Sequence, residues 1–299
     1  MPLSLLAFLF LLGAACSAIQ ILVPIAATMT PPEHRGRVIG NVMSGLMVGI
    51  LLSRPLASLV ADIWGWRSFY AVSAAALALL TATLAPRLPE RQPLVRSSYV
   101  SLIASLWHLL HDEAVLRIRA LTAALVMASF GLFWTAVALR LAQPPFSLGQ
   151  AGIAMFALVG AGGAVATSPF GRMGDRGWTR VATTVSHLIL IGAMTLSAWA
   201  GEAKASQPVI SLVLLGAGAV MLDVGVTGDQ TLGRRAINLL RPEARGRING
   251  LFVGIFFLGG AVGSALAGTA SSWGGWTAVC ATGAVFGAAA LLTGLATRS

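Results

Sequence analysis

Long, uninterrupted runs of apolar residues fill most of the chain, and short turns rich in glycine and proline separate them. A helix that crosses about 30 Å of hydrocarbon needs roughly 20 mostly apolar residues. Because the runs are continuous rather than alternating, helices and not strands must satisfy the backbone within lipid. The pattern predicts an all-α, polytopic membrane protein with nine spans, at about 3–29, 38–60, 66–86, 120–142, 150–170, 181–200, 208–230, 248–270 and 274–296.

Residues 87–119 form the one long polar connection. The chain therefore has three parts: residues 1–86, this connection and residues 120–299. Residues 1–86 carry three predicted spans, and residues 120–299 carry six. Within the connection, His108 to Glu113 looks like a metal-binding or acyltransferase motif, but the spacing of its histidines and leucines fits an amphipathic surface helix better. We therefore expect a central cytoplasmic loop at 87–119 that carries such a helix.

The composition excludes most soluble classes of protein. Hydrophobic residues make up 57% of the chain and charged residues 10%, against about 25% charged in soluble domains. Cys16 and Cys280 lie in distant apolar runs and support neither a disulfide framework nor a metal site. Without a nucleophile motif or a phosphate-binding loop, the sequence predicts a protein that is not an enzyme, with no cofactor and no nucleic-acid partner, in a lipid bilayer.

The net charge of +10 comes almost entirely from arginines, and their placement predicts the orientation. Connections rich in arginine alternate with connections that carry almost none. Cytoplasmic loops are the ones enriched in basic residues. We expect the arginine-rich side, with Arg298 and the C-terminus, to face the cytoplasm.

An internal repeat links the two ends of the chain. The block 32–37 (PEHRGR) recurs as 242–247 (PEARGR), and in the same register Gly65-Trp66 matches Gly275-Trp276. Duplicated halves of the same hand are one transporter architecture. Four spans stand between the central loop and the second block, but only one precedes the first, so symmetry leads us to expect three further spans before residue 1.

These features resemble the major facilitator superfamily, specifically its bacterial drug- or sugar-efflux-like branch. The resemblance rests on the arginine-rich loop between two halves, on Gly65 to Phe69, on Phe130 to Thr135 and on Gly171 to Arg180. The last stretch follows the family pattern G-x-x-x-D-R-x-G-R-R/K, except that Trp178 stands where glycine is expected and Thr179 replaces an arginine. The nine spans would then correspond to helices 4–12 of a twelve-helix fold.

The resemblance implies a secondary active transporter of a small organic compound. It implies two halves that rock around a central site, a monomer, a bacterial inner membrane, and proton-coupled efflux with the proton gradient as energy source. Uptake or facilitated diffusion of a sugar or organic acid is the alternative within transport. A truncated, inactive or scaffolding membrane protein is the alternative outside it.

The signature-like stretch predicts a conformational latch. Its members are Gly171, Asp175, Arg176 and Arg180. Asp175 ends one helix and is expected to accept hydrogen bonds from the start of the next, where the helix dipole favours an anion. Arg176 and Arg180 are expected to bridge to a neighbouring helix end, although ordinary positive-inside arginines would look the same.

Ionisable residues within predicted spans are candidates for coupling, because a charge near mid-bilayer costs roughly 2.5–3.5 kcal/mol. Asp223 lies near the middle of its span, where hydrocarbon favours the protonated carboxyl. It is a proton-coupling candidate, and a structural hydrogen bond between helices is the alternative. Arg54 is a second candidate, which could instead snorkel outward or bind an anion. Asp229 is expected to be solvated near the cytoplasmic interface.

By resemblance, five polar or aromatic residues are candidates for the substrate pathway: Gln20, Asn41, Trp134, Thr135 and Gln230. For Trp134, an interfacial anchor is the competing interpretation. Glycines four residues apart are expected to permit close helix packing. These pairs are Gly45/Gly49, Gly246/Gly250, Gly250/Gly254 and Gly259/Gly263.

Overall fold

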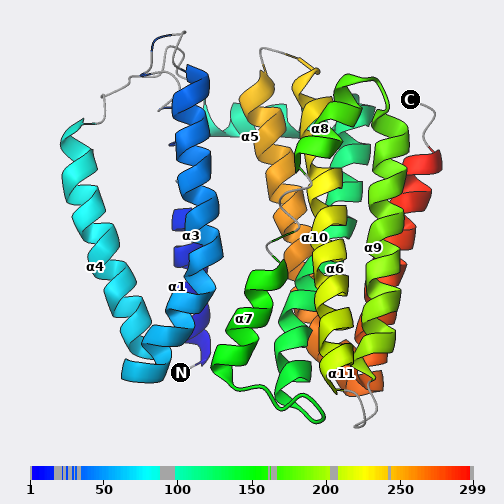
Figure 1. Cartoon of the computed structure of the whole chain (residues 1–299). Coiled ribbons are helices and arrows are strands. Elements are labelled where there is room, and N and C mark those ends of the chain that lie inside the picture. The colour runs from blue at the N-terminus through cyan, green and yellow to red at the C-terminus, as the bar shows by residue number, and fades with distance from the viewer. Residues whose placement is uncertain are drawn as a thin grey trace.

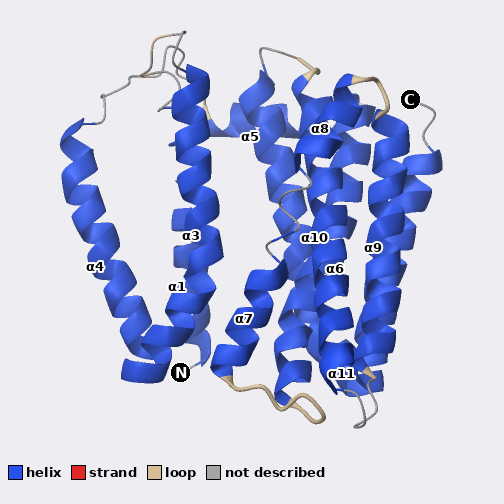
Figure 2. Cartoon of the chain, viewed as in Figure 1, coloured by secondary structure: helices blue, strands red, loops and turns tan. Residues whose placement is uncertain are grey.

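The computed structural model describes most of the chain as helices and short turns. The described residues are 2–16, 22, 25, 29, 31, 35–87, 98–160, 162, 167–202, 208–241 and 244–296. The helices are α1 Pro2–Cys16, α3 Arg35–Trp64, α4 Trp66–Leu84, η2 Ala85–Arg87, α5 Tyr99–Asp112, α6 Ala114–Ala142, α7 Gln150–Gly160, α8 Thr167–Asp175, α9 Thr179–Gly201, α10 Pro208–Asn238 and α11 Arg245–Ala296. Among these residues there is no strand, which confirms the predicted fold class (Figure 2).

The long helices run side by side and form two unequal groups (Figure 1). Helices α6, α9, α10 and α11 pack into a bundle, and α3 contacts this bundle through α7. Helices α1, α3 and α4 stand beside it. Within the described part, five helical segments are long and apolar enough to cross a membrane: Trp66–Arg87, Ala114–Ala142, Thr179–Gly201, Pro208–Asn238 and Arg245–Ala296.

Two predicted boundaries differ from the structure. Within the span predicted at 150–170 the structure describes α7, and α8 runs on beyond it to Asp175; residues 161 and 163–166 lie outside the described part. The described part of the polar connection, 98–119, is largely helical, because α5 lies within it and α6 already begins at Ala114. On α5, Leu109 is buried while Trp107 is exposed, as expected for an amphipathic surface helix.

The repeat predicted from sequence reappears in the backbone of its two Gly-Trp pairs. Gly65 separates α3 from α4 with φ 83° and ψ 155°. Gly275 divides α11 into two helices with φ 62° and ψ −149°. This region of backbone space is essentially restricted to glycine. The matched glycines therefore make the same kind of turn between consecutive helices, while the PExRGR blocks lie partly outside the described residues.

Replacing Gly275 by alanine should destabilise the protein. A side chain at this backbone conformation costs on the order of 1–3 kcal/mol. Gly268→Ala is the matched control, since Gly268 is helical and a Cβ there meets nothing within 4 Å. Thermal unfolding in detergent should show a lower midpoint for Gly275→Ala than for Gly268→Ala. Equal midpoints would contradict the strain at this turn.

Helices α6 and α11 meet along a seam of small residues, and this seam fixes the position of the site described below. A Cβ added to Gly259 would overlap the backbone of Ala124, and one added to Gly263 would overlap the backbone of Ala128. Close backbone approach through small residues is a common way to pack helices in lipid. The prediction for Gly259/Gly263 is confirmed.

The other predicted glycine pairs do not mark helix contacts in this structure. A Cβ at Gly45, Gly49, Gly246, Gly250 or Gly254 meets nothing within 4 Å. For these pairs the described residues provide no helix partner, and close packing stays a prediction. Spacing alone places two glycines on one helix face, but it does not say whether another helix lies against that face.

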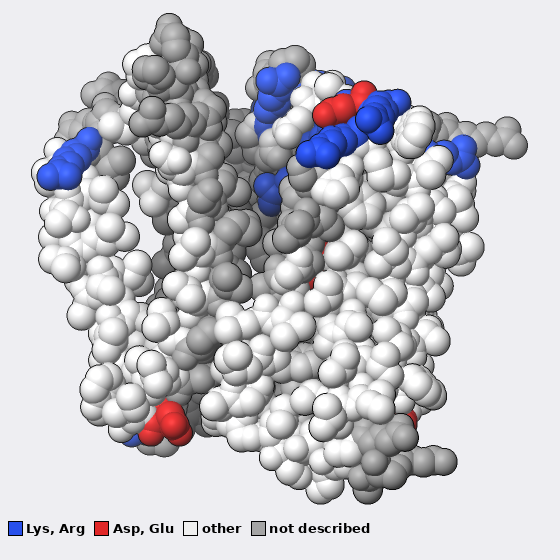
Figure 3. Space-filling model, in the orientation of Figure 1, with Lys and Arg blue, Asp and Glu red and all other residues white. Residues whose placement is uncertain are grey.

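Most of the described arginines of the bundle lie at the same end of it. This arginine-rich end is formed where α6, α9 and α11 begin and where α8 and α10 finish. Its members include Arg119, Arg172, Arg176, Arg180, Arg235 and Arg241. Figure 3 shows the basic side chains gathered there, while the flanks between the two ends are almost free of charge. Helix α1 begins at the opposite end from the one where α11 finishes (Figure 1).

Candidate functional site

A hydrogen bond inside the bundle joins two of the residues selected from the sequence. The indole Nε1 of Trp134 on α6 donates to Oδ1 of Asp223 on α10 across 3.1 Å. Asp223 lies at the middle of the 31-residue helix α10, and both side chains are half-buried. A bond of this kind is stronger when the acceptor carboxyl group is ionised. The contact joins the indole of α6 to the carboxyl group of α10.

Aromatic rings and one glycine hold Trp134 in place. Its ring meets Phe133 edge-to-face with centroids 5.5 Å apart, and Phe130 and Phe156 lie 6.1 and 6.2 Å away. Gly160, the last residue of α7, lies so close that a Cβ there would overlap the indole and come within 3.5 Å of Asp223 Oδ2. Such edge contacts orient a ring as well as burying it. These contacts place Trp134 against three phenylalanines of α6 and α7 and favour a position inside the bundle over an interfacial anchor.

A cavity of about 290 Å³ opens on the other side of Trp134, between α6 and α11. Its lining is mainly apolar and aromatic, and Thr135 with Ser264 supplies hydroxyls. The Thr135 hydroxyl donates to the Ser264 oxygen across 3.1 Å. The lining residues are Met127, Phe130, Gly131, Trp134, Thr135, Phe257, Gly260, Ala261 and Ser264. Small-molecule sites typically combine apolar walls with a few polar groups, and this cavity lies at the small end of their range.

Of the other pathway and coupling candidates, Gln230 and Asn41 are described and do not line this cavity. Gln230 is half-buried on α10, two turns beyond Asp223, and Asn41 is exposed on α3. Gln20 lies outside the described residues. Arg54 belongs to α3, but its side chain is not among those described. The structure therefore brings Trp134, Thr135 and Asp223 together, and the roles of Gln20, Asn41, Arg54 and Gln230 stay predictions.

At the arginine-rich end, the signature-like stretch forms a tight helix-to-helix turn. Helix α8 ends at Asp175, and the amides of Gly177 and Trp178 donate to the carbonyls of Gly174 and Met173, at 3.1 and 3.0 Å. This pair of bonds is the Schellman arrangement, which favours glycine at the left-handed position. Gly177 occupies it with φ 80°. Trp178 can replace the family's glycine because the residue before it makes the turn.

The partner of Asp175 differs from the expected one. Its Oδ1 accepts a hydrogen bond from Nε of Arg235 on α10, at 3.2 Å, rather than from the first amides of α9. Gly174 makes room for this arginine, since a Cβ there would lie 3.1 Å from Arg235 Cδ. Arg176 is exposed, and Arg180 turns toward a pocket described below. Asp175 thus joins α8 to α10, an interhelical contact that a latch requires.

If this contact is a latch, Asp175→Asn should slow transport far more than it destabilises the fold. The carboxylate is 75% exposed and the arginine 37%, so the pair contributes less than about 1 kcal/mol to stability. We expect thermal unfolding close to wild type, together with a clear loss of transport rate in proteoliposomes. Arg172→Gln removes an exposed charge from the same helix and serves as control. Wild-type transport by Asp175→Asn would remove the latch role.

A buried, hydrogen-bonded pair of ionisable residues was missed in the sequence. His187 Nε2 on α9 lies 2.9 Å from Oδ1 of Asp229 on α10, and their side chains are only 1% and 2% exposed. The expectation that Asp229 is solvated is wrong, because α9 packs over this face of α10 and the histidine supplies its partner. The signal was available: His187 is an ionisable residue within a predicted span, where such residues are rare.

Comparisons with known proteins agree with this architecture. The profile of the Major Facilitator Superfamily matches residues 1–227. The putative uncharacterized transporter YgaY of Escherichia coli K12 is 35% identical over 289 residues, covering 95% of this chain and 71% of that protein. The YgaY protein of Escherichia coli O157:H7 matches over the same shares. The probable transporter SCO4007 of Streptomyces coelicolor is 30% identical over 276 residues, covering 90% of this chain and 61% of that protein.

These matches confirm the resemblance drawn from the sequence motifs. The family is one of transporters rather than enzymes, and the apolar helices fit a multi-pass membrane protein. The family assignment rests on a profile match over most of the chain and on a relative that is 35% identical over 289 residues. The chain belongs to the Major Facilitator Superfamily of membrane transporters.

Proposed function

We propose that this protein is a proton-coupled exporter of a small organic compound, and that Trp134 and Asp223 form the coupling site. The observation that carries the proposal is the hydrogen bond from the indole to the carboxylate at the middle of α10. One face of Trp134 lines the cavity while its N–H meets Asp223, so one side chain touches both the place for a substrate and the place for a proton.

The chemistry of exchange follows from the charge on Asp223. When the carboxylate is ionised, it accepts the indole hydrogen bond and holds the ring against the cavity. When it takes up a proton, it becomes a weaker acceptor, since charge-assisted bonds are roughly twice as strong as neutral ones. The ring is then freer to shift. A substrate that packs on Trp134 and a proton that binds Asp223 would therefore influence each other's affinity, as coupling requires.

The cavity favours an organic compound with apolar surface over a sugar. Its walls are aromatic and aliphatic, and only Thr135 and Ser264 offer side-chain hydroxyls. A sugar presents a hydroxyl on almost every carbon, and each one buried without a partner costs free energy. Uptake or facilitated diffusion of a sugar or organic acid remains the second candidate, because the relatives are named only as transporters.

The proposal includes an orientation. With the arginine-rich end in the cytoplasm, as the positive-inside rule expects, α11 finishes on the cytoplasmic side. The bacterial relatives support placement in a bacterial inner membrane, since bundles of apolar helices are inserted there. The proton gradient then supplies the energy, and no cofactor is required.

Proteoliposomes that contain a pH-sensitive dye test this function. Compounds are added in two sets, small aromatic organic compounds and sugars or organic acids, with and without an imposed pH gradient. We expect members of the first set to move protons through the wild-type protein, and Asp223→Asn to abolish that movement. Transport of sugars without proton movement would favour the second candidate. Gradient-driven transport that survives in Asp223→Asn would overturn the role of Asp223.

A further inference from the structure

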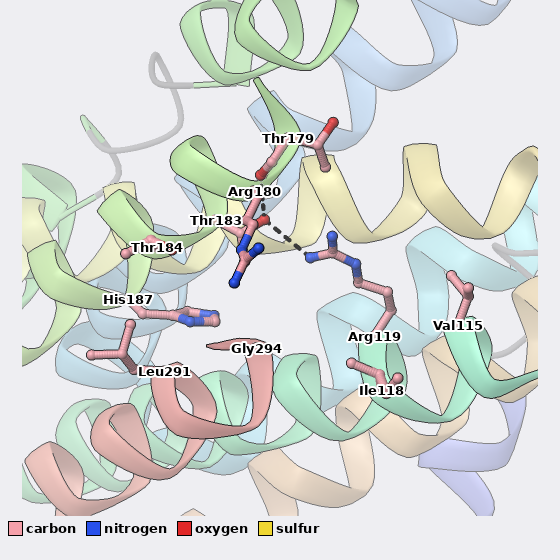
Figure 4. A pocket seen from close by; sticks show the side chains of 10 residues that line it. All are labelled: Val115, Ile118, Arg119, Thr179, Arg180, Thr183, Thr184, His187, Leu291 and Gly294. Carbon is pink, nitrogen blue, oxygen red and sulfur yellow. Dashed lines mark hydrogen bonds between the residues drawn. The ribbon is translucent and has the colours of Figure 1, made fainter. Parts of the chain in front are cut away.

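A second, smaller cavity lies at the arginine-rich end, away from Trp134. It has a volume of about 100 Å³ and sits between the start of α6, the start of α9 and the end of α11. Figure 4 shows Arg119, Arg180 and His187 pointing into it from different sides. None of the residues that line it is acidic. The cavity therefore presents positive charge to whatever enters it.

A hydrogen bond holds the Arg119 guanidinium in place. Arg119 Nη1 donates to the hydroxyl oxygen of Thr183 across 3.0 Å, and that hydroxyl donates to the carbonyl of Thr179 across 2.8 Å. Thr179 is the first residue of the 23-residue helix α9, so the partial positive charge of the helix end adds to that of the two arginines. Arginine is the side chain best suited to phosphate, through its planar set of donors.

An unpartnered nitrogen within the cavity indicates a ligand. The Nδ1 atom of His187 is buried and has no hydrogen-bond partner among the described residues, while Nε2 is held by Asp229. The Nδ1 edge of the ring faces Gly294 on α11, where a Cβ would lie 3.7 Å from Cε1 and 3.9 Å from Nδ1. Because Gly294 has no side chain, no side chain of this residue lies against that edge of the ring, and His187 is one of the residues that line the cavity. Buried ring nitrogens usually have a partner.

We propose that this cavity binds a phosphate group, and that the group is the headgroup of an anionic phospholipid. The oxygens would meet Arg119 and Arg180, and a protonated oxygen could donate to His187 Nδ1. Val115, Ile118 and Leu291 also line the cavity and offer apolar surface beside the charges, which suits a lipid better than a free ion. The site is separate from the proposed transport site and does not depend on the direction of transport.

The test measures binding of phosphatidic acid and of diacylglycerol, which differ by the phosphate group, to the full chain in detergent by native mass spectrometry. The wild type should bind phosphatidic acid at least tenfold more tightly than diacylglycerol. Arg119→Gln with Arg180→Gln should remove most of this difference. The control is Arg172→Gln with Arg245→Gln, which also removes two charges, from exposed arginines that do not line the cavity.

A second variant keeps the test decisive if the protein that carries both Arg119→Gln and Arg180→Gln fails to fold. Gly294→Ala changes no charge and makes only ordinary contacts with the His187 ring, yet it places a methyl group against the Nδ1 edge. It should weaken phosphatidic acid binding several-fold without lowering the thermal unfolding midpoint. If millimolar inorganic phosphate competes with the lipid and stabilises the wild type but not Gly294→Ala, the site holds free phosphate as well. Equal binding of both lipids, or binding unaffected by Gly294→Ala and the arginine pair, would overturn the proposal.

Discussion

Trp134→Ala should weaken substrate binding by about 30-fold, the fold-change that corresponds to a loss of about 2 kcal/mol at an aromatic hot spot. The reason is the double contact of this ring: it lines the cavity between α6 and α11, and its indole N–H meets Asp223. Removing the ring takes away packing surface and leaves the carboxylate without this donor. The measurement is the KM for whichever compound the proteoliposome assay identifies.

Two further variants make this result interpretable. Trp134→Phe retains an aromatic ring without the N–H, so we expect an intermediate effect of about tenfold, as for a hydrogen bond to a charged group. Trp199→Ala is the matched control, because Trp199 is 71% exposed on α9 and contacts neither the cavity nor Asp223. A wild-type KM for Trp134→Ala would show that the substrate binds elsewhere.

Gly263→Leu should destabilise the protein by about 3 kcal/mol or more, and it should lower the yield of folded protein. A Cβ at this position would overlap the carbonyl oxygen of Ala128 and come within 2.8 Å of its Cα. Backbone atoms cannot rotate away as a flexible side chain can, so α6 and α11 would have to separate. Overpacking of a close contact costs typically 1–3 kcal/mol and sometimes more.

Gly254→Leu is the control for this substitution. Gly254 lies on the same helix as Gly263, but a Cβ there meets nothing within 4 Å. We expect the control to unfold near the wild-type temperature and Gly263→Leu to unfold well below it, in the same detergent. Equal unfolding temperatures would mean that the seam between α6 and α11 is looser than described. The same seam positions Gly131 and Ser264 at the cavity, so Gly263→Leu should also impair transport.

The sequence predicted the class of fold because the hydrophobic signal is strong and nearly continuous. Length and apolarity identify a membrane helix without knowledge of its neighbours. The turns at Gly65 and Gly275 could also be predicted from the sequence, because a Gly-Trp pair repeated in one register implies that the two glycines share a backbone conformation. The end of α8 at Asp175, five residues beyond the span predicted at 150–170, could not be predicted, since the polar residues after Phe170 suggested that the helix had already ended.

The candidate site was predicted in part, for reasons that concern individual residues. Asp223 stood out because a carboxylate in an apolar run is costly. Its partner Trp134 was selected only by resemblance, since no pattern in one sequence reveals a contact between α6 and α10. The same limit explains Asp229, where the distance from the helix end suggested solvent. Only the packing of α9 places His187 against it.

The most direct test of the central claim is a double-mutant cycle on Trp134 and Asp223. Binding of the identified compound is measured for wild type, Trp134→Phe, Asp223→Asn and the double variant, each checked for folding by thermal unfolding. If the indole and the carboxylate act as one coupling unit, the double variant should be no worse than the more damaging single variant. If the two losses multiply, the residues act independently, and the account of coupling through their hydrogen bond is contradicted.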